Sequence, residues 1–184
     1  SEIEKILKDV DKKLKDSSRE SEESVKESRD LLRESSERSE RSVRETRKRV
    51  DDLLRLVDER KDEKLIREIE ERARRIADKN RRIVEESKRL VEEAVRKNED
   101  IVRKSAELVE RIIRELEDLL RKRNEEDMKR EIDKLVEKLK KVLRDNKRLH
   151  EKVIRELEEV VTRNEELHRR VIKEAKEVVD RVRK

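Results

Sequence analysis

Residues 146–154 read NKRLHEKVI, and residues 164–172 read NEELHRRVI. The second stretch repeats the first after 18 residues, with Asn, Leu, His, Val and Ile at matching places. Eighteen residues make about five turns of a straight α-helix, because one turn takes about 3.6 residues. The repeat therefore returns each side chain to the same side of one helix. It predicts a straight helix rather than the left-handed supercoil that a repeat of about seven residues would impose.

Polar residues of this repeat fall on its apolar side. At about 100° per residue, Asn146 shares a stripe with Leu149 and Val153, and His150 lies at the edge of that stripe. Asn164 returns to the angle of Asn146 one repeat later. An isolated polar group costs most on a buried face. We therefore expect the Asn and His side chains to have hydrogen-bond partners elsewhere in the chain.

The composition favours long amphipathic helices. Charged residues make up 58% of the 184 residues and apolar residues 30%, with no Gly, Pro, Cys or aromatic residue. High charge and low hydrophobicity are typical of disorder, but disordered chains are usually rich in Pro and Gly, and the apolar residues here recur with helical periodicity. Apolar runs never exceed two residues, so neither a membrane span nor a signal peptide is expected. Without Cys there is no disulfide or thiolate metal site, and the cellular compartment stays undetermined.

The net charge of +5 gives no indication of nucleic-acid binding. It is the small difference between 56 basic and 51 acidic residues, and the two signs alternate along the chain. The sequence has no unbroken basic stripe and no aromatic residue on which a base could stack. A solvated surface with many ion pairs explains the charges, and we expect neither a nucleic-acid nor a membrane partner.

Two further segments carry repeats of the same length. Serines 17, 21 and 24 recur as serines 35, 39 and 42, while Asn80 and Ser87 recur as Asn98 and Ser105. The phase of the apolar stripe changes near 58–64 and 121–128, which are polar apart from Met128. We therefore predict helices over about 2–59, 63–121 and 125–183, with Asp62 and Asn124 as N-caps. Short connections make neighbouring helices antiparallel. The predicted fold is an all-α, long, straight antiparallel three-helix bundle that forms one domain over 1–184.

Turning the chain at the two polar stretches brings the polar residues of the three segments level with one another. They separate into two groups, with apolar layers between and beyond them. We expect Ser24 to face Asn98 and His150, and Ser42 to face Asn80 and His168. The first predicted buried network contains Ser17, Ser21, Ser24, Asn98, Ser105, Asn146 and His150. The second contains Ser35, Ser39, Ser42, Asn80, Ser87, Asn164 and His168. Ser, Asn and neutral His each donate and accept, so together they can satisfy one another in a dry core.

Other chemical interpretations have little support. His150 and His168 are 18 residues apart, about 27 Å along a helix, so they cannot bind one metal ion. A catalytic Ser–His pair would need a carboxylate that orients the imidazole, and a cleft. We expect all acidic residues to face outward, and a packed bundle offers no pocket. We therefore predict no catalytic, cofactor-binding or metal-binding residue, and a structural hydrogen-bonding role or a pH-responsive role for the histidines.

The chain resembles computationally designed helical bundles with buried hydrogen-bond networks. The resemblance covers the whole chain and rests on the repeated pairs Asn80/Asn98, Asn146/Asn164 and His150/His168, on the Glu, Arg and Lys surface, and on the lack of aromatic residues. Proteins of this group serve as scaffolds, orthogonal heterodimers, caged switches and pH-responsive assemblies. The resemblance thus implies a designed protein without a natural biochemical activity.

Two functional hypotheses follow. In the first, the chain is a monomeric structural scaffold, is not an enzyme, and requires neither a cofactor nor a partner. In the second, it is an interaction or switch module: a helix-displacement device, half of a heterodimer, or a pH-responsive homo-oligomer completed by a second copy or a designed partner helix. The wide apolar stripes of the second and third segments motivate this alternative, as at 83–84 and 160–161.

Overall fold

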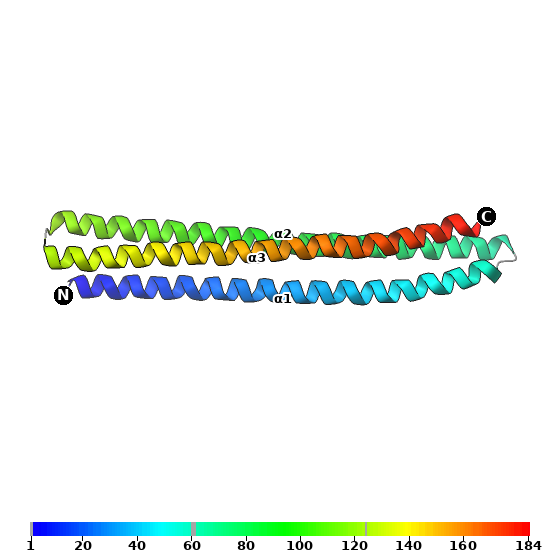
Figure 1. The fold of residues 1–184 in the computed structure, drawn as a ribbon, viewed down its shortest axis with the longest axis horizontal. Coiled ribbons are helices and arrows are strands. Elements are labelled where there is room, and N and C mark those ends of the chain that lie inside the picture. Colours follow the sequence, from blue (N-terminus) through cyan, green and yellow to red (C-terminus); the bar gives the residue numbers. More distant parts are fainter. Residues whose placement is uncertain (1, 60–61, 124) are drawn as a thin grey trace. The chain divides into compact units, whose positions relative to one another are not determined.

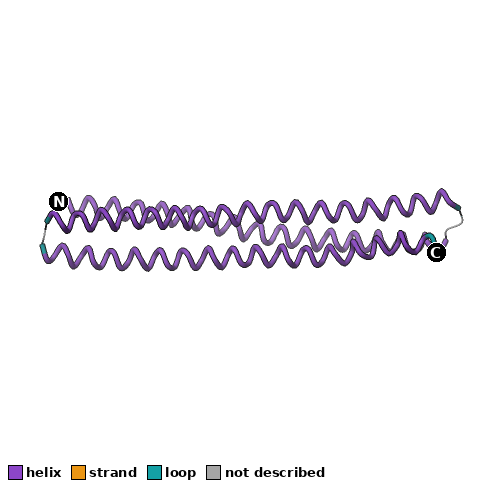
Figure 2. Tube along the Cα trace, turned by 90° about the horizontal axis from the view of Figure 1, so that it is seen from above, coloured by secondary structure: helices purple, strands orange, loops and turns teal. Residues whose placement is uncertain are grey.

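Three long helices make up nearly all of the chain. The computed structural model describes residues 2–59, 62–123 and 125–184. Helix α1 spans Glu2–Glu59, α2 spans Glu63–Lys122 and α3 spans Glu126–Val182 (Figures 1 and 2). The described residues contain no strand, and none of their helices is long and apolar enough to cross a membrane. The predicted all-α three-helix bundle is confirmed, and each helix boundary lies within one residue of its predicted position.

Helix α2 begins where a side chain caps it. The Oδ1 atom of Asp62 accepts a hydrogen bond of 2.7 Å from the backbone N–H of Leu65, which is the geometry of an N-cap. At the start of α3, Glu126 and Asp127 place negative charge near the free N–H groups of the first turn. The predicted cap at Asn124 lies outside the described residues.

The residues divide into two compact units. Unit 1 comprises Ser1–Arg29 and Ala94–Arg155, and unit 2 comprises Asp30–Glu93 and Glu156–Lys184. Every helix therefore contributes one segment to each unit. The expectation of a single domain over 1–184 stays a prediction.

Unit 1 is built on an apolar core to which all three helices contribute. Its helix segments are antiparallel: Glu2, at the start of α1, pairs with Arg123, just after α2, and Glu27 pairs with Lys97 at 2.7 Å. The buried core consists of Val10, Val109, Ile112, Leu116, Met128, Ile132 and Leu139. This core holds the helix segments on which the first group of polar residues lies.

Unit 2 has an apolar core of its own. Its helices are antiparallel too, since Arg183, just after α3, pairs with Glu63 at the start of α2 at 3.3 Å. Arg38 and Glu86 link α1 to α2 at 3.2 Å. The buried core consists of Val50, Leu53, Val57, Ile69, Ala73, Ile76, Ala77, Ala175, Val178 and Val182.

Candidate functional site

A buried histidine lies at the centre of the polar residues of unit 1. The side chain of His150, on α3, is fully buried. Its Nδ1 atom lies 2.6 Å from Oδ1 of Asn98 on α2, and its Nε2 atom lies 2.5 Å from Oγ of Ser21 on α1. One imidazole thus links the three helices. We call the hydrogen-bonded group around it network 1.

The amide of Asn98 determines which nitrogen of His150 carries the proton. Its Nδ2 atom donates to the backbone carbonyl of Ala94 at 2.7 Å and to Oγ of Ser28 at 2.9 Å. A carbonyl can only accept, so the amide nitrogen must point toward Ala94 and the amide oxygen toward His150. The imidazole therefore donates through Nδ1, and its neutral form leaves Nε2 as an acceptor.

A second arm of network 1 runs from Ser21 toward the polar residues nearer the N-terminus of α1. Ser21 Oγ lies 2.5 Å from Oδ1 of Asn146, whose Nδ2 atom donates to Ser105 Oγ at 3.3 Å. Ser105 in turn lies 3.2 Å from Ser17, Oγ to Oγ. The structure thus brings six of the seven residues that we predicted for this network into one connected set.

The hydroxyl of Ser21 has one proton and two neighbours that can accept it. If Ser21 donates to neutral His150 at Nε2, no proton remains for Oδ1 of Asn146. Rotating the Asn146 amide by half a turn resolves this, because Nδ2 then donates to Ser21 and Oδ1 accepts from Ser105. If His150 is an imidazolium, both ring nitrogens donate and Ser21 donates to Asn146 without any rotation. Network 1 can therefore satisfy its hydrogen bonds in both protonation states of His150.

Unit 2 contains a second group with the same chemistry, which we call network 2. His168 is fully buried, with Nδ1 2.7 Å from Oδ1 of Asn80 and Nε2 3.1 Å from Oγ of Ser39. The amide nitrogen of Asn80 donates to the carbonyl of Ile76 at 2.8 Å and to Oγ1 of Thr46 at 3.0 Å. The same reasoning gives His168 the same Nδ1–H tautomer as His150.

The remaining residues of network 2 form a separate hydrogen-bonded set, because no hydrogen bond among the described residues joins them to the set around His168. Asn164 donates through Nδ2 to Ser35 at 3.0 Å and to Ser87 at 3.5 Å, and the two serine hydroxyls lie 2.5 Å apart. Its Oδ1 atom is buried and has no hydrogen-bond partner among the described residues. In network 1 the matching oxygen, on Asn146, lies beside Ser21. The two networks therefore have the same hydrogen bonds around the histidine but differ at the side-chain oxygen of Asn146 and Asn164.

Two predicted members do not take the places that we expected. We expected Ser24 to meet Asn98, but its buried hydroxyl has no partner in the described part of the chain, and Ser28 accepts from Asn98 instead. Ser42 is only half-buried, and Thr46 accepts from Asn80 in its place.

Side-chain direction explains this shift of one turn. Side chains lean toward the N-terminus of their own helix. In an antiparallel pair, the long Asn98 side chain therefore reaches toward later residues of α1, and Ser28 leans back to meet it. Both Ser28 and Thr46 lie on the polar stripe of the sequence. The stripe therefore indicated the correct face of α1, and only the predicted alignment along the helix axis was wrong, by about one turn.

Burial shifts the titration of both imidazoles. Desolvation lowers the pKa of His150 and of His168 from the ordinary value of 6.5. The lowering means that the neutral form is favoured in the folded chain, because moving a charge out of water is costly. This agrees with the role that the geometry gives to Nε2 as an acceptor from a serine.

One carboxylate departs from the expectation that all acids face outward. The side chain of Glu70 is 10% exposed, and its Oε1 atom lies 2.6 Å from Nε of Arg183. Arg74 lies 3.6 Å from its other oxygen. This pairing offsets the cost of burying the charge. Among the described residues, Glu70 pairs with arginines and not with either histidine.

Metal binding finds no support in the described residues. None of them form a group of three or more His, Cys, Asp or Glu side chains that could hold an ion. The polar atoms around each histidine are amide and hydroxyl groups that already bind one another. The arrangement therefore holds hydrogen-bond donors and acceptors of the three helices in fixed positions.

Fold and networks together define a class: a three-helix bundle whose core contains polar layers. Neither a protein-family model nor a curated protein matches the chain. A solved structure described as a "Computationally designed three helix bundle" is similar to it, with 21% identity, a TM-score of 0.43, and coverage of 99% of this chain and 86% of that chain. The buried Ser, Asn and His side chains that the resemblance to designed bundles implies are present in this chain itself.

Proposed function

We propose that this chain is a designed structural scaffold without a natural catalytic activity, in which the two networks specify how the helices align. The observation that carries the proposal is the recurrence of one bonding plan after 18 residues. Each histidine donates to an asparagine of α2 and contacts a serine of α1, and each of these asparagines also donates to its own helix.

This arrangement of hydrogen bonds favours one alignment of the helices, because each buried polar group needs a partner of matching donor or acceptor type. If α2 slipped by one turn, the amide oxygen of Asn98 would leave His150, and the ring N–H would be buried without an acceptor. Each stranded group costs about 1–3 kcal/mol. Leu, Ile and Val tolerate a slip far better, since any apolar neighbour suits them. A buried polar residue is known to fix the register of helical assemblies in this way.

The proposal is tested with a variant in which the members of both networks are replaced by apolar residues. The chain lacks Cys, so spin labels can be attached to introduced cysteine pairs without interference. We expect the parent to give one narrow distance distribution between α1 and α2, and the variant to give several despite greater stability. A variant as narrow as the parent would contradict the alignment role.

Oligomeric state tests the scaffold proposal separately. The hydrogen bonds that each histidine makes lie within a single chain, so these bonds need no second copy. We expect light scattering to give a mass near 22.4 kDa. Twice or three times that mass would favour the interaction hypothesis instead.

A specific observation supports the interaction module as second candidate. Between residues 17 and 49, α1 has only four apolar residues, Val25, Leu31, Leu32 and Val43, and the two leucines are half-buried. This stretch buries little apolar surface, so a more apolar helix could replace it. If α1 is displaceable, amide hydrogens of this stretch will exchange faster than those of α2 and α3. Uniform protection across the helices would contradict this candidate.

A further inference from the structure

A groove in unit 2 lies between α1 and α2. Its volume is about 430 Å³, which lies within the range of small-molecule sites. Three apolar side chains line it: Leu53 and Ile76 are buried, and Leu56 is half-buried. An apolar ligand body could cover these side chains without opening the core.

The remaining lining residues are almost all cationic. Asp52 is the only acid among the lining residues described, and five basic residues line the groove with it: Arg49, Arg72, Arg75, Lys79 and Arg82. Clefts lined by one sign of charge concentrate ions of the opposite sign.

Local ion pairs leave much of this positive charge uncompensated. Arg72 and Arg75 pair with acids of their own helix, at 2.7 Å and 2.5 Å. For Arg49, Lys79 and Arg82, the described residues include no ion pair. These three cations are therefore available to an anion from outside the chain.

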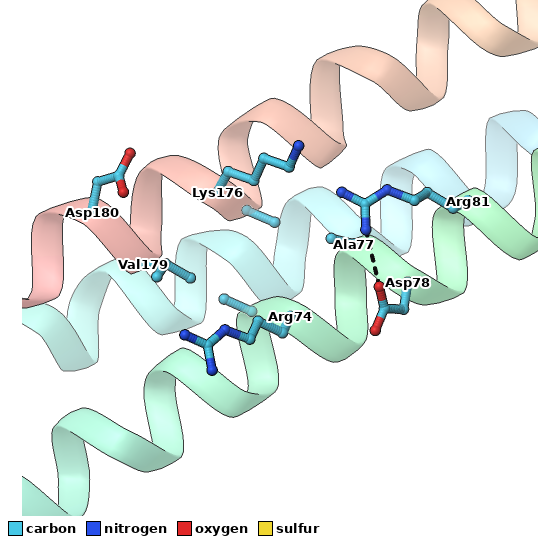
Figure 3. Close-up of a pocket in the computed structure, with 9 residues that line it drawn as sticks. Arg74, Ala77, Asp78, Arg81, Lys176, Val179 and Asp180 are labelled. Atoms are coloured by element: carbon cyan, nitrogen blue, oxygen red, sulfur yellow. Dashed lines mark hydrogen bonds and ion pairs between the residues drawn. The ribbon is translucent and has the colours of Figure 1, made fainter.

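A second groove in the same unit provides an internal comparison (Figure 3). It lies between α2 and α3 and has the same volume of about 430 Å³. Its rim mixes both signs, with Arg74, Arg81 and Lys176 beside Asp78 and Asp180, and Arg81 pairs with Asp78 at 3.0 Å. The two grooves match in size but differ in two respects: the second has a mixed charge balance, and its apolar lining is mainly alanine rather than leucine and isoleucine.

We propose that the groove between α1 and α2 binds small amphipathic organic anions, such as an aromatic sulfonate or a medium-chain carboxylate. The apolar body of the ligand covers Leu53, Leu56 and Ile76, and its anionic head contacts Arg49, Lys79 and Arg82. Guanidinium groups suit such heads because their N–H groups form a planar fork. The cations are solvent-exposed, so each contributes modestly and the dissociation constant is on the order of 0.1 mM. This activity goes beyond the scaffold role and does not depend on the networks.

The first experiment titrates the intact chain with 8-anilinonaphthalene-1-sulfonate while methyl resonances are followed by NMR. We expect saturable binding that shifts the methyl groups of Leu53, Leu56 and Ile76. Raising the salt concentration from about 0.05 M to about 0.5 M will weaken binding several-fold, because exposed charges are screened. The neutral analogue N-phenyl-1-naphthylamine will bind more weakly than the sulfonate. Equal binding of both probes, shifts confined to other methyl groups, or no binding would overturn the proposal.

A matched pair of variants localises the site. The first carries Arg49→Gln, Lys79→Gln and Arg82→Gln, and the second carries Arg74→Gln, Arg81→Gln and Lys176→Gln. Both remove three exposed positive charges, so both have the same net charge. The second also removes Arg74 from beside the buried Glu70, but Arg183 stays within 2.6 Å of that carboxylate, so we expect both variants to fold, which circular dichroism checks. We expect the first to weaken sulfonate binding about tenfold and the second to leave it unchanged. An equal loss in both variants would show that the sulfonate responds only to net charge, and would overturn the assignment of the site.

Discussion

The ring of His150 donates its Nδ1 proton to Oδ1 of Asn98 across 2.6 Å, and the direction of this bond is set one helical turn away. The amide nitrogen of Asn98 is held by the carbonyl of Ala94, which leaves only the amide oxygen for the imidazole. His168 and Asn80 repeat the relationship at 2.7 Å. A backbone acceptor on α2 thus determines the protonation pattern of a side chain on α3.

The tautomer is the first prediction. In aqueous solution, neutral histidine usually carries its proton on Nε2, whereas both rings here should carry it on Nδ1. At a pH above about 7.5, long-range ¹H–¹⁵N correlation spectra should show the Nδ1–H pattern for both residues. The Nε2–H pattern at either ring would mean that the neighbouring asparagine amide points the other way.

Replacing Asn98 by Leu gives the second prediction. The change removes the acceptor of His150 and the donor to Ser28 and leaves both buried. Each loss costs about 1–3 kcal/mol, and the added apolar burial returns about 1–2 kcal/mol. We expect a denaturant midpoint that is unchanged or lower. Replacing every member of network 1 by an apolar residue should raise the midpoint, since no partner is then stranded. A single Asn98→Leu variant with a much higher midpoint would show that Asn98 does not belong to a network in solution.

Two serines of α1 provide the third prediction as a matched pair. Both are buried, but the hydroxyl of Ser24 has no partner among the described residues, whereas that of Ser28 accepts from Asn98. Ser24→Ala should stabilise the fold by about 1 kcal/mol, because it removes an unsatisfied polar group and Ala favours helix. Ser28→Ala should destabilise it by about 1–3 kcal/mol. Urea denaturation of the two variants checks this, and the same sign of change in both would refute it.

Much of the fold could be predicted because the periodicity is unambiguous. The 18-residue repeat fixed which side chains share a face, and the polar stretches near 58–64 and 121–128 placed the loops. Turning the chain at those stretches then grouped Asn98 with His150, and Asn80 with His168.

The alignment of polar residues along the helix axis was harder to predict, because the positions of the loops set this alignment only to about one turn. The direction in which each side chain leans decides which residues meet within that turn. Ser28 therefore takes the place that was predicted for Ser24. The buried carboxylate of Glu70 was not predicted either, because a single acid within a highly charged helix has no repeat that distinguishes it from the exposed acids around it. Periodicity also does not predict the groove between α1 and α2, because a groove depends on whether the side chains of two helices fill the space between them.

The proton count at Ser21 gives the fourth prediction. Oδ1 of Asn146 and Nε2 of His150 both lie 2.5 Å from the one hydroxyl, so protonation of the ring changes which of them receives its proton. Acid titration of His150 should therefore rotate the Asn146 amide. We expect the side-chain ¹⁵N–H₂ signals of Asn146 to shift with the same midpoint as the ring signals of His150. In a His150→Asn variant the shift should be absent. Asn146 signals that stay constant while His150 titrates would contradict the coupling.

Acid stability is the last prediction, and its sign follows from burial. Desolvation lowers the pKa of His150 and His168 in the folded chain from the ordinary 6.5, so the unfolded chain binds protons first as the pH falls. Stability is therefore complete above about pH 6.5 and declines below it until the lower pKa of the folded state is reached.

Two such residues limit the slope to about 2.7 kcal/mol per pH unit. Because network 1 keeps its hydrogen bonds with a protonated ring, the loss comes from desolvation of the charge, and the apolar clusters should keep the chain folded. We expect a lower urea midpoint at about pH 4.5 than at about pH 7.5, and a smaller difference in a His150→Asn/His168→Asn variant. An equal loss in both proteins would mean that carboxylates, rather than the two buried imidazoles, account for the sensitivity to acid.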